Sequence, residues 1–259
     1  MAGGIRDTAR MIDPIEQFNI EKIFTIGHIG NQEIAFTNSS AYMFGSVALI
    51  SLFMIGGVAG RQLVPGRIQS MAELSYEFVA NTIQSTAGKE GMKFFPLVFS
   101  IFMLLTVSNM VGVIPYSFTI SSHLIVTAAL ALLVFFTVLT YGFYKNGLKF
   151  FKLFVPSGIP IVILPLVVFI EVFSFFLRPI SHSVRLFANM LAGHIALTVF
   201  ASFIPVLAGL GIAGYTGAVL PLGMVIALTA LELLVAFLQA YVFTILTCIY
   251  LNDAIHPGH

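Results

Sequence analysis

Charged residues are rare in the long apolar part of the chain. Between residues 94 and 252, outside a short basic stretch at 145–152, only four charged side chains occur. They are Glu171, Arg178, Arg185 and Glu232. An arginine at membrane depth costs at least about 2.5–3.5 kcal/mol, and it cannot lose its proton to escape that cost. Charges in such a setting point to ion translocation or to the binding of an anion.

Three of these charges belong to a polar stripe. A helix over 160–204 places a set of polar side chains within about 80° of one another, because each residue turns the helix by about 100°. The set is Glu171, Ser174, Arg178, His182, Arg185 and Asn189. Ala188, Ala192 and Ala196 continue the same face, and small residues at this spacing let another helix approach closely. The pattern predicts that Arg185 is a fixed positive charge awaiting an anion.

A second interpretation of the two arginines stays open at this point. Arg178 and Arg185 could cap the ends of two shorter spans. The stretch RPISHSVR at 178–185 would then be an exposed loop.

The last apolar segment adds a second group of polar residues. Glu232 and Gln239 are seven residues apart, which places them on one helix face about 10.5 Å apart along the axis. His194 follows Arg185 by nine residues and therefore lies on the opposite side of its helix. This arrangement predicts a water-accessible path separate from the contact surface of the arginine. The alternative is that His194 is a structural histidine satisfied by one local hydrogen bond.

Composition predicts an all-α polytopic membrane protein. The chain has 259 residues, of which 58% are hydrophobic and 9% charged, whereas about a quarter are charged in soluble domains. We expect spans at 42–60, 94–114 and 122–144. We also expect an amphipathic surface helix at 67–88, with Ile68, Met71, Leu74 and Phe78 on its apolar face; the alternative is a packing helix that faces water. The stretches 160–204 and 216–252 exceed the roughly 20 residues of a perpendicular span. We expect them to form a long tilted two-helix hairpin that turns at GIAGYTG, residues 211–217.

Charge distribution predicts the orientation and excludes several functions. Basic residues gather at 61–93 and 145–152, so the polar N-terminal segment 1–41 is expected outside and the C-terminus inside after about five crossings. A net charge of +1 without a long basic run argues against binding nucleic acid. Cys248 is the lone cysteine, which excludes an internal disulfide and a thiolate metal cluster. Neither a metal site, a cofactor site nor a nucleotide-binding loop is predicted.

Three motifs carry a resemblance to a known family. They are S-x-R-L-F-A-N-M-x-A-G-H at 183–194, S-N-x-x-G-x-I-P-Y at 108–116, and the run that begins L-E-L-L-V-A-F-L-Q at 231–239. Over residues 95–253 the chain resembles the a subunit of the membrane sector, Fo, of F-type ATP synthases. The resemblance implies that 160–204 is one tilted helix, and it implies a stationary, non-catalytic subunit that couples proton flow to ATP synthesis.

The resemblance also implies roles for individual residues. Arg185 would be the essential arginine facing a rotating ring of c subunits, with Asn189 beside it and Gln239 supporting its position. The outside half-channel would be lined by His194, Glu232 and Asn109. The inside half-channel would be lined by Glu171, Ser174 and Ser181. The small residues that face the ring would be Ala188, Ala192 and Ala196.

The implied partners are the c ring, b-type peripheral stalk subunits, membrane lipids and, indirectly, the F1 catalytic head. The implied location is the inner (plasma) membrane of a bacterium or, alternatively, the inner membrane of an organelle. His194 and Glu232 stand exchanged relative to many bacterial members, as in the mitochondrial branch. The proton is the expected coupling ion, with sodium as the alternative.

Two other classes of protein compete with this interpretation. One is a self-contained secondary transporter or channel in which Arg185 pairs with Glu171 or Glu232. The other is a respiratory-complex subunit that binds quinone or haem. The second requires matching histidines on two helices, whereas His182 and His194 lie in one predicted span.

Overall fold

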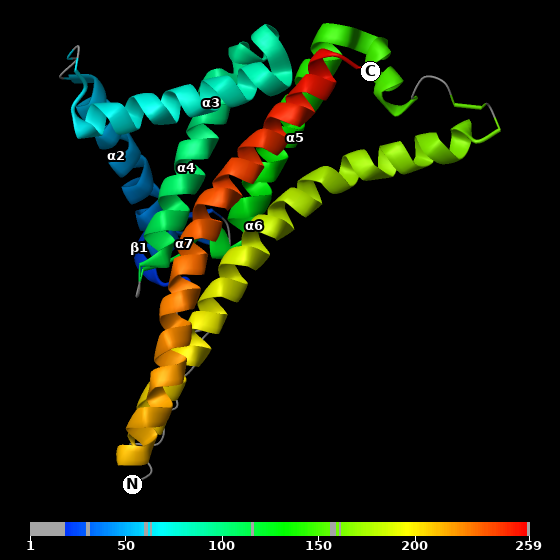
Figure 1. Cartoon of the computed structure of the whole chain (residues 1–259). Helices are drawn as coiled ribbons and strands as arrows, with labels where there is room; N and C mark the ends of the chain where they lie inside the picture. The colour runs from blue at the N-terminus through cyan, green and yellow to red at the C-terminus, as the bar shows by residue number, and fades with distance from the viewer. Residues whose placement is uncertain are drawn as a thin grey trace. The chain divides into compact units, whose positions relative to one another are not determined.

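The computed structural model describes residues 19–29, 32–59, 62, 64–114, 117–155, 159–160 and 162–257. It begins with an antiparallel hairpin of β1 (Lys22–Ile29) and β2 (Gln32–Thr37). The long helices, labelled in Figure 1, are α2 (Asn38–Ala59), α3 (Arg67–Gly91), α4 (Phe95–Val113), α5 (Leu124–Asn146), α6 (Leu164–Ala208) and α7 (Ile212–Ile255). Short 3-10 helices are η2 (Met92–Phe94), η3 (Ile120–Ser122) and η4 (Gly147–Phe154).

Five helical stretches among the described residues are long and apolar enough to cross a membrane. They are Asn38–Ala59, Arg67–Val113, Leu124–Phe154, Leu164–Ala208 and Gly214–Ile255. The predicted class, an all-α polytopic membrane protein, is confirmed.

The β-hairpin lies in a segment for which the sequence analysis predicts only a polar N-terminus. Phe24 and Phe36 are partners across the two strands, and their rings stack with centroids 5.0 Å apart. Phe36 also stacks on Phe44 in the first turns of α2, at 6.0 Å. Cross-strand aromatic pairs stabilise a hairpin, but a two-stranded unit is too short to give a strong sequence signal. Residues 1–18 of the predicted segment lie outside the described residues.

Helix α3 leaves most of its predicted apolar face exposed. Ala72, Val79 and Ile83 are buried. Ile68, Met71 and Leu74 expose 57%, 59% and 64% of their surface, whereas Phe78, the fourth residue of the predicted face, is half-buried. Large apolar side chains left exposed on such a helix suit a lipid environment. Gly88 has a φ of +66°, so the helix is interrupted where the predicted element 67–88 ends.

The two longest helices have 45 and 44 residues (Figure 1). Helix α6 continues through RPISHSVR, so the interpretation of 178–185 as an exposed loop is wrong.

The predicted turn at 211–217 is also wrong, because α7 already begins at Ile212. The turn lies at 209–211, where Gly211 adopts a φ of +85°. Gly214 instead allows the start of α7 to pack closely against the end of α6. A Cβ there would lie 2.0 Å from the carbonyl oxygen of Leu207 in α6.

The chain divides into two compact units, and α2, α4, α6 and α7 contribute residues to both. Unit 1 comprises Met1–Ser46, Val107–His123 and Leu186–Leu238. Unit 2 comprises Val47–Thr106, Leu124–Arg185 and Gln239–His259.

Candidate functional site

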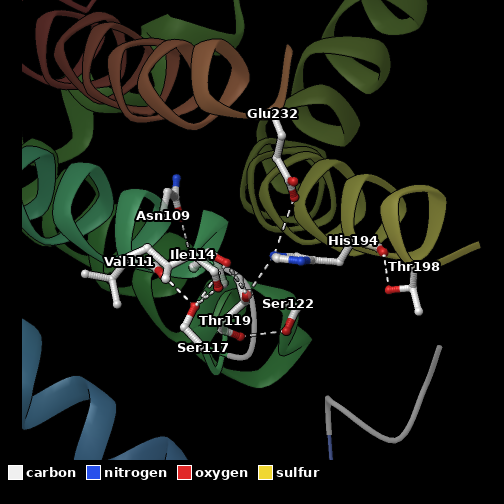
Figure 2. A network of polar contacts seen from close by, with 11 residues as sticks. Asn109, Val111, Ile114, Ser117, Thr119, Ser122, His194, Thr198 and Glu232 are labelled. Carbon is white, nitrogen blue, oxygen red and sulfur yellow. Dashed lines mark hydrogen bonds and ion pairs between the residues drawn. The ribbon is translucent and has the colours of Figure 1, made fainter. Parts of the chain in front are cut away.

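In unit 1, helices α6 and α7 bring the predicted titratable pair together. Nε2 of His194 lies 3.5 Å from Oε1 of Glu232, and both side chains are buried, with residue exposures of 8% and 5% (Figure 2). Neither carboxylate oxygen of Glu232 has a hydrogen-bond partner among the described residues. A buried carboxylate without hydrogen bonds is costly unless a proton or a neighbouring cation offsets the charge. The pair is therefore suited to exchanging a proton.

Thr119 is a third member of this cluster, and the sequence analysis does not predict it. Its hydroxyl lies 2.7 Å from Nε2 of His194 and can donate a bond to the carbonyl oxygen of Gly112 at 3.3 Å (Figure 2). Gly112 allows this approach, because a Cβ at that position would lie 2.8 Å from Cγ2 of Thr119. Thr119 belongs to the connection between α4 and α5, where periodicity gives no signal.

Asn109 lies in the same unit, at the α4 side of the cluster. Its amide donates to the carbonyl oxygen of Ala236 in α7 at 3.3 Å, four residues after Glu232. Its side-chain oxygen accepts a bond from Ser121 at 2.5 Å. Asn109 is fully buried and thus ties α4 to α7 through a polar contact.

Gly193 determines how closely Glu232 approaches α6. A Cβ at position 193 would lie 2.9 Å from Oε1 and 3.3 Å from Cδ of Glu232. Real Cβ atoms do not make a contact as short as 2.9 Å, so a larger residue must displace the carboxylate.

If the chain couples proton flow to ATP, as its resemblance implies, we expect Gly193→Ala to lower ATP-driven proton pumping roughly ten- to a hundredfold, because displacement of a reacting group by about 1 Å costs that much. The change should leave assembly intact, since only the end of a flexible side chain has to move. Pumping is measured as acidification of inverted membrane vesicles. Gly223→Ala in α7 is the matched control, because a Cβ there meets no atom within 4 Å. Equal pumping by the two variants would contradict this role of Gly193.

In unit 2, Arg185 is exposed. Among the described residues no ion pair joins it to a carboxylate. Of the residues predicted for the inside half-channel, Glu171 is half-buried while Ser174 and Ser181 are exposed. Gln239, the predicted support of the arginine, is 4% exposed. Within the part of the chain that the structure describes, none of the three inside-channel residues joins a polar cluster comparable to that of His194 and Glu232.

Arg178, in contrast, forms an ion pair within unit 2. Its guanidinium donates to Oδ2 of Asp253 at 2.7 Å, and its Cζ lies 4.8 Å from the ring centroid of Tyr250. Bidentate-capable arginines commonly combine an ion pair with an aromatic contact in this way. Asp253 stands one residue beyond the apolar segment 94–252, so counting the charges of that segment misses this partner.

The predicted small residues differ in exposure. In unit 1, Ala188, Asn189 and Ala192 are exposed, whereas Ala196 is half-buried. Exposed small residues leave room for the close approach of another helix.

Together, the fold and the site define a polytopic membrane protein that carries titratable side chains within its spans. The family model of the ATP synthase A chain matches residues 40–252. The chain is 86% identical over 249 residues to ATP synthase subunit a of Rhodopseudomonas palustris strain BisB18, covering 96% of this chain and 100% of the relative. Its identity to ATP synthase subunit a of Nitrobacter winogradskyi is 80% over 249 residues, with the same coverage of 96% and 100%.

The chain therefore belongs to the ATP synthase A chain family. It is a subunit of the Fo membrane sector of an F-type ATP synthase and assembles with other subunits of that complex. Its apolar helices and its bacterial relatives make it a bacterial membrane protein.

Proposed function

We propose that this chain is the stationary proton-translocating subunit, with two offset half-channels and an arginine that faces a rotating ring of c subunits. The observation that carries this proposal is the state of Arg185. It is an exposed cation on a membrane-spanning helix without an ion-pair partner among the described residues. Because such a charge is costly in lipid, an anion supplied by another subunit is the natural partner.

The outside half-channel in this proposal consists of His194, Glu232 and Asn109. The 3.5 Å contact between His194 and Glu232 supports it, because a side-chain shift of about 0.3 Å would bring the imidazole and the carboxylate within the roughly 2.6–3.2 Å over which a proton passes directly. The proposed inside half-channel contains Glu171, Ser174 and Ser181. Their position on α6 and the partial exposure of Glu171 support this second half-channel.

Rotation would alternate the state of a ring carboxylate. A carboxylate that faces lipid must be neutral, since desolvation disfavours its charged form. One that passes Arg185 meets a fixed cation, which favours ionisation and release of the proton. Protons would enter through the His194 and Glu232 side, travel around the ring, and leave toward Glu171. The exposed Ala188, Asn189 and Ala192 would allow the ring helices to approach α6.

The remaining assignments follow from this function. The chain would have no catalytic activity and would pass the energy of the proton gradient, about 2.3 kcal/mol per proton for each 100 mV, to the F1 head as torque. A b-type peripheral stalk would hold it stationary. Its N-terminus would lie outside the bacterial inner membrane and its C-terminus inside, as the distribution of basic residues predicts.

The competing self-contained transporter needs an internal partner for the arginine. Within unit 2, Glu171 does not form an ion pair with Arg185 among the described residues. This observation favours an external partner.

Disulfide crosslinking in native membranes tests the proposal. We expect a cysteine at Ala188 or Ala192, in a Cys248→Ser background, to crosslink to a cysteine on the outer helix of a c subunit. The crosslink should stop ATP-driven proton pumping, and a reducing agent should restore it. The matched control is a cysteine at Met190, which is fully buried on the same helix.

Failure to capture a c subunit, together with proton conduction by the isolated chain in liposomes, would refute the rotary role. Family membership would remain, but the arginine face would then serve another contact.

A further inference from the structure

His182 belongs to the polar stripe of α6, yet neither proposed half-channel uses it. Its side chain is buried in unit 2, with 3% of the residue exposed. The imidazole ring stacks on Phe243 with centroids 3.8 Å apart and meets the ring of Tyr250 edge-on at 5.8 Å. These two residues of α7 hold the ring in one orientation.

That orientation leaves one ring nitrogen unsatisfied. Nε2 of His182 is buried and has no hydrogen-bond partner among the described residues. An unsatisfied buried polar atom destabilises a folded protein, and most buried polar atoms bond to protein or to ordered water. A small ligand that can hydrogen-bond is therefore expected beside this atom.

A cavity lies next to His182, between α5, α6 and α7. Its polar lining consists of Arg178, His182 and Tyr250, and the rest of its wall is apolar. The space available to the centre of a water-sized sphere is about 10 Å³. This volume is close to the minimum that holds one water molecule, and a buried water needs between two and four polar partners.

We propose that this cavity binds a water molecule that accepts from or donates to Nε2 of His182 and connects it to Tyr250 and Arg178 in the inside proton path. The inference rests on the proposed function and adds a link to the inside half-channel. His182 is a positioning residue here, because it holds the water rather than the ring carboxylate. The site lies one helical turn before Arg185, on the same helix.

The proton balance of this link is simple. The water accepts on a lone pair the proton that a ring carboxylate releases beside Arg185, and it gives up a different proton from one of its O–H bonds toward Glu171, so its composition is unchanged. Arg178 only donates a hydrogen bond to this water, because its guanidinium does not release a proton. The charged groups nearby are Arg178 and Arg185 on α6 and Asp253 on α7, which is paired with Arg178. The residues of α5 that line the cavity are apolar. The hydroxyl of Tyr250 is the remaining titratable group of the lining.

Two substitutions of His182 test the link in the assembled complex. We expect His182→Leu to lower passive proton conduction about tenfold in vesicles stripped of the catalytic head, as for a barrier raised by about 1.4 kcal/mol. His182→Gln should retain at least roughly half of the conduction, because an amide can still hold the water. Equal losses of proton conduction in both variants would show that His182 has a purely structural role. Unchanged conduction by the His182→Leu variant would show that His182 has no role in conduction.

If the His182→Leu variant does not assemble, a second measurement tests the water site. His182→Cys, combined with Cys248→Ser, should become sensitive to Ag⁺ added from the inside, because replacing the imidazole by the smaller thiol leaves room in the cavity for a dehydrated ion of about the size of a water molecule. Leu186→Cys is the control, since Leu186 is fully buried on α6 and does not line the cavity. Insensitivity of the His182→Cys variant would refute the water site. If Arg185→Ala also kept pumping, the proposed function itself would fail, which separates the two ideas.

Discussion

Arg185→Ala should abolish ATP-driven proton pumping by the assembled ATP synthase. A unit charge about 4 Å from a ring carboxylate, at an effective dielectric constant near 20, contributes about 4 kcal/mol in favour of the ionised form. This corresponds to roughly three pKa units, at 1.36 kcal/mol per unit. Without the cation, a carboxylate at the exit would ionise about a thousandfold less readily, so the ring would not release its protons.

Acidification of inverted vesicles on addition of ATP measures this effect. Val184→Ala is the matched control, because Val184 is the preceding residue, is 45% exposed, and loses side-chain atoms without losing charge. We expect this control to pump at no less than about half the parental rate, as surface truncations outside special features have small effects. Quantification of the c subunits in both membranes separates loss of function from loss of assembly. Normal pumping by Arg185→Ala would exclude the proposed function.

Exchanging His194 and Glu232 should harm pumping much less than removing either of them. A positioned proton-transfer group contributes about 10²- to 10⁴-fold, so we expect His194→Ala and Glu232→Ala each to lose at least about a hundredfold. The double exchange keeps one imidazole and one carboxylate on α6 and α7. Thr119, which contacts Nε2 of His194 at 2.7 Å, can donate its hydroxyl proton to a carboxylate at position 194 as well. Pumping by the exchanged protein should therefore return to within about tenfold of the parent.

The same vesicle assay compares the three variants, with Thr119→Val as an added probe of the hydroxyl contact. If the exchanged protein were as impaired as the single variants, the two residues would act independently and the paired half-channel would be wrong. A partial loss in Thr119→Val, together with full assembly, would show that the ring of His194 depends on this hydroxyl.

Helix class follows directly from the sequence, because it depends on local composition. Runs of apolar residues with few charges predict the spans, and the motif around Arg185 predicts a single long helix, which α6 is. The separation of His194 from the arginine face also follows from helix periodicity. Accordingly, Arg185 is exposed and His194 is buried.

Contacts across helices could not be predicted in the same way, because they depend on which helix faces approach each other. Thr119 beside His194, Asp253 beside Arg178 and the cavity at His182 each join segments that are distant in the chain. Gly193 belongs to the motif at 183–194 and Gly214 to the predicted turn, but only the structure shows the neighbouring side chain or carbonyl that requires a glycine at each position.

By itself, then, the sequence determined that the chain is an all-α membrane protein, which family it belongs to, and which few polar residues lie in its spans. These properties are local, because the free energy of transfer into the membrane is counted residue by residue and a motif is a pattern of residues along the chain. Only the tertiary structure decided which buried polar atoms have partners and which do not. Hydrogen bonds and ion pairs form at about 3 Å, a distance fixed by packing between helices and not by spacing along them.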